Sequence, residues 1–184
     1  MTITITKRTI RWAITLVAIA ASISSTSALA QSQTSVTGAG AGIFPQGVLF
    51  NGVSLSALSF GIGAVILTND GTATGTFEST LTGTSLLGRR NIVVVGNLTH
   101  GSGQVGGPAT YSGLCSIDLG DGTPLLTGLP FMVTAARLPN TQWGLTLLLG
   151  LALLPAAPVN TGIVTIQWVR RTSSLTSLTS LCSS

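Results

Sequence analysis

The chain has 184 residues, of which 45% are hydrophobic and only 7% are charged. Much of its positive charge lies near the N-terminus, so the charges beyond residue 30 nearly balance. They are Arg89, Arg90, Arg137, Arg170, Arg171, Asp70, Glu78, Asp118 and Asp121. Because binding to a phosphate backbone needs clustered Lys and Arg, the composition excludes an ordinary nucleic-acid-binding role.

The first 30 residues have the pattern of a secretory signal peptide. Basic residues precede a mostly apolar run at positions 12–21, and Ala28 and Ala30 form a small-x-small site of the kind that signal peptidase cuts. The apolar run of roughly ten residues is too short for a membrane anchor, which needs ~20. We therefore predict that residues 1–30 are removed on export and that the mature chain begins at Gln31. It would then be secreted, periplasmic or at the cell surface.

Residues 31–47 are rich in Gly, Ala, Ser and Thr and show no helical period. Glycine gives a strand nothing to pack and costs backbone entropy to fix. The composition predicts a flexible leading segment, with at most a short edge strand at positions 35–37.

Alternating apolar residues, the two-residue period of a half-buried strand, begin at Val48. Asn69-Asp70-Gly71 then separates two alternating runs, a strong signal for a hairpin, and the second run has a Thr-rich face opposite an apolar face. Residues 91–99 form the next predicted strand. Its first half is apolar on both faces, as expected for a strand covered on both sides.

The clearest hairpin is predicted between Ala109 and Arg137, with a long Gly-rich tip around residues 120–124. Another strand follows at 143–149. Prolines within 155–158 are expected to break the chain before a last strand at 162–169. The predicted core residues are Phe60, Ile62, Phe77, Ile92, Val94, Ile117, Phe131, Val133, Leu145, Leu147 and Ile166.

These patterns predict an all-β domain over residues 48–171, an antiparallel meander of about seven or eight strands. We expect it to close as a small β-barrel, because so few charges are present to protect the exposed edges of an open sheet. A two-sheet β-sandwich is the alternative.

Two cysteines, Cys115 and Cys182, follow the predicted cleavage site. An oxidising compartment would allow a disulfide between them, which would hold the Ser/Leu-rich tail of residues 172–184 against the central hairpin. In the alternative, Cys115 is a buried apolar residue and Cys182 a free thiol in a loosely ordered tail.

Few side chains are suited to catalysis or metal binding. His100 is the only histidine and is expected in an exposed loop, which excludes a His-rich metal site. Asp70, Asp118 and Asp121 lie in predicted turns, where carboxylates commonly accept hydrogen bonds from nearby backbone amides. We therefore predict no catalytic, cofactor-binding or metal-binding residues and no cofactor.

Two further groups of charged residues have expected roles. If the Thr-rich face of the second hairpin strand lined a barrel lumen, Glu78 and Arg137 could together form a polar anchor for a ligand. The pairs Arg89-Arg90 and Arg170-Arg171 are expected to be solvated side chains at strand ends.

The expected function is that of an exported, non-catalytic β-barrel that binds a small apolar ligand or serves a structural role at a surface. We expect no membrane association. Two alternatives remain open at this stage, a small outer-membrane β-barrel and an isomerase or cyclase with a site in the lumen.

Overall fold

The structure, a computed structural model, describes residues 32–67 and 70–169, and the predicted signal peptide and tail lie outside these ranges. The described residues form nine strands: β1 (Gln33–Ile43), β2 (Leu49–Phe50), β3 (Val53–Leu67), β4 (Ala73–Ser85), β5 (Gly88–Gly103), β6 (Ala109–Asp118), β7 (Leu126–Arg137), β8 (Trp143–Leu149) and β9 (Ala152–Val169).

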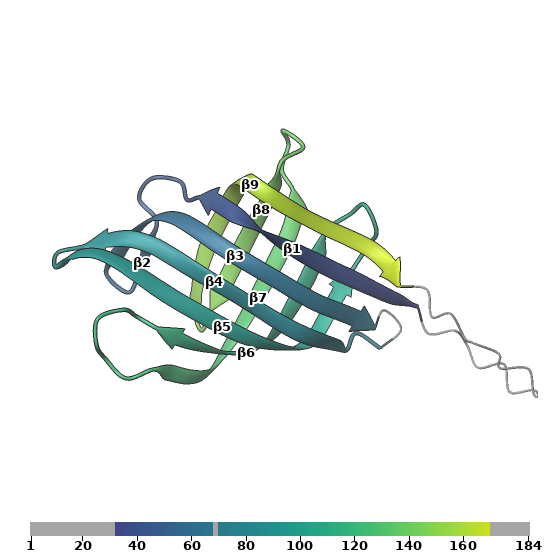
Figure 1. Cartoon of the computed structure of the whole chain (residues 1–184), viewed down its shortest axis with the longest axis horizontal. Helices are drawn as coiled ribbons and strands as arrows, with labels where there is room; N and C mark the ends of the chain where they lie inside the picture. Colours follow the sequence, from purple (N-terminus) through teal and green to yellow (C-terminus); the bar gives the residue numbers. More distant parts are fainter. Residues whose placement is uncertain (1–31, 68–69, 170–184) are drawn as a thin grey trace, which may run out of the picture. The chain divides into compact units, whose positions relative to one another are not determined.

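The strands close into an antiparallel barrel (Figure 1). From β3 to β9 each strand pairs with the next one along the chain, and β1 lies between β9 and β3. The short β2 pairs only with β3, so it is an addition to a barrel of eight strands. The prediction of a closed all-β meander is confirmed, and the sandwich alternative is wrong.

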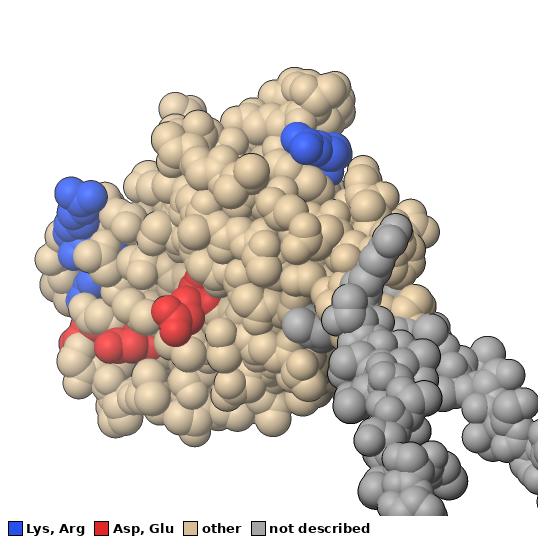
Figure 2. Space-filling view, turned by 45° about the vertical axis from the view of Figure 1, so that its right-hand side comes forward, with Lys and Arg blue, Asp and Glu red and all other residues tan. Residues whose placement is uncertain are grey.

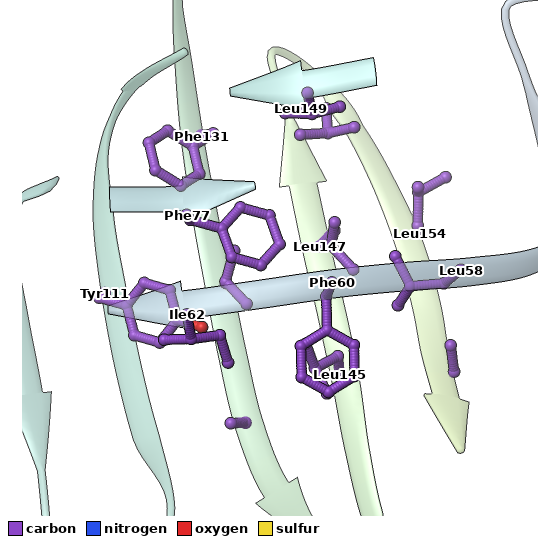
Figure 3. Close-up of a cluster of buried hydrophobic side chains, with 14 of the residues drawn as sticks. Leu58, Phe60, Ile62, Phe77, Tyr111, Phe131, Leu145, Leu147, Leu149 and Leu154 are labelled. Atoms are coloured by element: carbon purple, nitrogen blue, oxygen red, sulfur yellow. The ribbon is translucent and has the colours of Figure 1, made fainter. Parts of the chain in front are cut away.

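A single apolar core fills the barrel, and all eleven residues predicted for it are buried. Aromatic rings lie at its centre (Figure 3): Phe77 is 6.1 Å from both Tyr111 and Phe131, measured between ring centroids. A Cβ atom built on Gly96 would lie 2.3 Å from Cζ of Phe131. The ring of Phe131 therefore occupies the space that a side chain at position 96 would need.

The segment predicted to be flexible is instead β1, an 11-residue strand that closes the barrel. Its glycines are required by close backbone approach. A Cβ atom on Gly40 would lie 2.3 Å from the carbonyl oxygen of Thr161 in β9, and one on Gly38 would lie 2.7 Å from that of Ile163. Glycine-rich sequence here reflects tight strand packing, which the composition alone does not distinguish from flexibility.

The prolines expected to break the chain lie inside β9, which runs through Pro155 and Pro158. This strand pairs with β8 over residues 152–158 and with β1 over residues 159–169. The prolines thus lie where β9 has one paired neighbour, and its register with β8 shifts between Leu154 and Ala157. A strand edge or bulge tolerates the missing amide hydrogen of proline.

The first half of β5 differs from expectation as well. Its inward residues Ile92 and Val94 are buried, but Val93 and Val95 are 39% and 41% exposed. No other described element therefore covers the outer face of β5, since the described strands form a single sheet with its apolar core inside.

Successive strands run in opposite directions, so the connections alternate between two ends of the barrel. We call one the distal end; it carries the connections at 44–52, 86–87, 119–125 and 150–151. The opposite, terminal end carries the remaining connections, the start of β1 and the end of β9 (Figure 1).

Candidate functional site

Glu78 and Arg137 do not form a lumenal pair. Both are exposed, on strands β4 and β7, which are not neighbours in the sheet. Nη1 of Arg137 donates a hydrogen bond to the carbonyl oxygen of Thr141 at 2.6 Å, and its guanidinium lies 4.3 Å from the ring centroid of Trp143. Arg137 therefore stabilises the connection between β7 and β8, and the idea of a polar anchor in the lumen is wrong. The outward face of β4 carries the Thr residues, and its inward face carries the core.

Cys115 is a buried thiol that faces the barrel interior and is only 3% exposed. It forms no disulfide in this structure. Burial raises the pKa of the thiol, because a thiolate would lose its hydration there. Cys182 lies outside the described residues, so the pairing stays a prediction. The burial of Cys115 favours the alternative, a small apolar core residue.

The acidic residues in the turns behave as predicted. Asp70, Asp118 and Asp121 each accept a hydrogen bond from the amide two residues along, at 2.9, 2.8 and 3.0 Å. Hydrogen bonds from the Thr72 amide and hydroxyl lower the pKa of Asp70. These carboxylates hold turns together.

His100 is exposed, as expected, but it lies in β5, which continues to Gly103. Its Nδ1 is 2.9 Å from the hydroxyl of Thr99.

Three polar side-chain atoms of the described residues are buried without a hydrogen-bond partner: the hydroxyl oxygens of Thr34, Ser79 and Tyr111. Burial raises the pKa of Tyr111 far above its ordinary value, so the phenol stays protonated. Its ring lies among Phe77, Ile62 and other core residues (Figure 3). The hydroxyl is an isolated polar group in an apolar core.

A hollow of about 320 Å³ opens at the distal end, where three connections converge. Its lining combines Leu86, Leu87 and Leu119 with the charged side chains of Arg90 and Asp121. Nη1 of Arg90 donates a hydrogen bond of 2.8 Å to the carbonyl oxygen of Gly120, which joins β5 to the connection after β6.

The charges of this hollow are held by local contacts. Hydrogen bonds from the hydroxyl and amide of Thr123 lower the pKa of Asp121, and the positive charge of Arg90 lowers it further. Both charged groups therefore already have partners within the turns. The exposed Leu86 and Leu87 lie beside Arg90 and Asp121, whose charges are already hydrogen-bonded. This arrangement suits a contact surface made mainly by the apolar side chains.

Exposed leucines occur on all four distal connections. We call them the leucine rim: Leu49, Leu86, Leu87, Leu125 and Leu151. Leu86 and Leu151 are fully exposed. Sequence reasoning missed the rim because it appears only when alternate connections are known to share one end. One sequence feature could have indicated it, the Leu86-Leu87 pair between Ser85 and Gly88. A tight turn between two strands is expected to carry polar residues, so two leucines there are unusual.

The other hollows have a different character. One of about 340 Å³ at the terminal end is lined mainly by Gly, Ser, Gln, Pro and Thr residues. A third, of about 220 Å³, is a shallow groove on the barrel wall beside Glu78. Charged side chains are sparse on the face shown in Figure 2. The leucine rim and its hollow are therefore the candidate site, since they combine exposed apolar side chains with polar groups.

Within the residues that the structure describes, no helix has the length and apolar character needed to cross a bilayer. The same residues contain no group of three or more His, Cys, Asp or Glu that could hold a metal ion. Comparison of the chain with protein-family models, with curated proteins and with solved structures found no match.

Proposed function

We propose that the protein is an exported, non-catalytic β-barrel that serves a binding role at a surface and makes its contact through the leucine rim. The observation that carries the proposal is the presence of exposed leucine on every distal connection. Exposed apolar side chains gathered at one end of a small domain usually mark an interaction site, because leaving them in water is unfavourable.

Because the interior is filled, a contact through the leucine rim is favoured, and a ligand bound in the lumen is disfavoured. Large side chains, among them Phe77, Tyr111 and Leu145, are almost completely buried there. A small apolar ligand in the lumen would have to displace these rings and side chains. The energetic cost would be that of opening a packed core.

The apolar interior of the barrel opposes the outer-membrane alternative. Barrels that span a membrane have an apolar band outside and a polar interior. Here the interior is apolar, while the outer face of β4 carries Thr74, Thr76 and Glu78. For the enzyme alternative, the charged groups of the distal hollow would have to react, yet Arg90 and Asp121 are engaged in hydrogen bonds that hold turns.

The test is retention of the exported protein on a phenyl matrix at high salt. Leu86→Ser/Leu87→Ser should elute clearly earlier than wild type with unchanged thermal stability, since both side chains are exposed. Val105→Ser is the matched control, an exposed apolar residue on a connection at the terminal end, and it should elute close to wild type. If the rim variant and wild type co-elute, the proposal is wrong. An apolar molecule recovered at one per chain by solvent extraction would instead support a lumenal ligand.

A further inference from the structure

We propose that the leucine rim inserts into the surface of a phospholipid bilayer, so that the barrel stands on the membrane with its terminal end outward. The inference rests on the proposed function and names its partner. It departs from the sequence-based expectation of no membrane association. The rim residues would enter the boundary between headgroups and acyl chains, the depth at which peripheral proteins bury apolar side chains.

The shape of the leucine rim suits a lipid bilayer better than the surface of another protein. Its leucines come from four separate connections, and Leu86 and Leu151 are fully exposed, so neither is packed against neighbouring residues. A protein partner would have to match several separate projections at close packing density. Acyl chains rearrange around each projection, so a lipid surface accommodates them together.

The charges behind the rim are placed at headgroup depth. Arg89 follows Leu87 by two residues in β5, roughly 7 Å along an extended chain. An apolar group at a membrane interface is buried about 5–10 Å deep. Arg89 is exposed and therefore free to reach a phosphate from its strand.

The net charge of the distal end is close to zero, and this charge determines which class of phospholipid it should bind. Arg89 and Arg90 are balanced by Asp118 and Asp121 at the connection after β6. Attraction to anionic lipid depends on an excess of Lys and Arg. The rim therefore fits a zwitterionic phospholipid, and binding should depend on apolar insertion more than on salt.

The described residues of the terminal end lack this combination. Among its described connections, residues 138–142 expose polar side chains such as Asn140 and Thr141, and residues 104–108 expose Val105. Trp168, near the end of β9, is exposed but belongs to one strand. This asymmetry sets the orientation of the barrel on the bilayer.

The experiment is co-sedimentation of the exported protein with phosphatidylcholine vesicles. We expect binding that Leu86→Ser/Leu87→Ser weakens by at least about tenfold, because each leucine buried in an apolar phase contributes a factor of about ten. Val105→Ser should bind within about twofold of wild type, as expected for an exposed residue away from the contact. Adding phosphatidylglycerol or 0.5 M salt should change the affinity by less than about threefold, since the end carries no excess charge.

Each contrary outcome has a distinct meaning. If wild type fails to bind vesicles while its phenyl retention still depends on Leu86 and Leu87, the lipid inference is wrong and the proposed function stands. Sedimentation velocity that shows a dimer, lost in the rim variant, would identify a second copy as the occupant and overturn the inference. If the rim variant changes neither vesicle binding nor phenyl retention, the proposed function is wrong too.

Discussion

The packing of the barrel interior depends on glycines that lie opposite large side chains. At Gly96 on β5 the absent side chain leaves room for the ring of Phe131 from β7, and at Gly40 the ring of Phe60 would lie 3.2 Å from an added Cβ atom. Such complementarity fills a narrow barrel without voids. Glycine inside a strand then reports close packing.

The buried Tyr111 hydroxyl should lower the free energy of unfolding of the protein. It is buried and has no hydrogen-bond partner among the described residues, so folding removes its hydration without replacement. Tyr111→Phe keeps the ring and removes the unpaired group, and we expect the free energy of unfolding to rise by about 1–2 kcal/mol. Urea denaturation of the two proteins measures the difference. A loss of stability would show that the hydroxyl has a partner in solution.

Cys115 should react with a thiol reagent only when the barrel opens. Its burial restricts access, and its raised pKa keeps the sulfur protonated at neutral pH. In the native exported protein we expect no labelling of Cys115. In denaturant without reductant we expect full labelling, detected by peptide mass. A Cys115 that becomes reactive only after reduction would show that it is bonded to Cys182.

At the level of elements, the strands from β3 to β8 could be predicted from the sequence. Their alternation of apolar and polar residues indicates which face is inward, as the burial of Ile62, Phe77 and Val133 confirms. The two strands that meet where the barrel closes, β1 and β9, were harder to predict. In β1 glycine replaces the alternating apolar residues, and in β9 prolines interrupt them, so neither has the usual pattern.

The candidate site was less predictable than the fold. Its leucines lie in connections, which have no periodicity, and they come together only through the order of the strands. The charges of Arg90 and Asp121 are 31 positions apart in the chain, and no local motif joins them.

The close pairing of β1 with β9 gives a prediction for β1. Gly40→Ala would place a Cβ atom against the Thr161 carbonyl oxygen of β9, and backbone atoms cannot easily move aside. We expect a loss of about 1–3 kcal/mol in the free energy of unfolding. Ala39→Val is the control, because residue 39 is exposed on the same strand, and it should change stability by less than about 0.5 kcal/mol. Equal stability of the two variants would contradict a tightly paired β1.

For the whole molecule, closure explains how a chain with so few charges can avoid pairing through sheet edges. Edge strands are commonly protected by lysine or other charged residues. Here β1 joins β9 to β3 and closes the sheet. The edges that remain are the short β2 and the side of β9 that has no partner, since β9 pairs with β8 over residues 152–158 and with β1 over residues 159–169.

Export gives a second prediction for the whole chain. If residues 1–30 are a signal peptide, N-terminal sequencing of the exported protein should begin at Gln31. We expect that protein to remain in solution without detergent, since Thr and Ser side chains such as Thr74, Thr76 and Ser59 are exposed on the outer wall. Recovery of the chain from the membrane fraction with Met1 intact would contradict export by cleavage.

The central claim is that the barrel interior is filled by the protein's own side chains, which moves its function to the outside. The most direct test is the free energy of unfolding of Gly96→Ala, measured beside Gly63→Ala. A Cβ atom at position 96 would meet the Phe131 ring, whereas one at position 63 would meet no atom within 4 Å. We predict that Gly96→Ala loses about 1–3 kcal/mol. Gly63→Ala should change stability by less than about 1 kcal/mol. If both variants are as stable as wild type, Phe131 has free space to move into, and the interior is hollow.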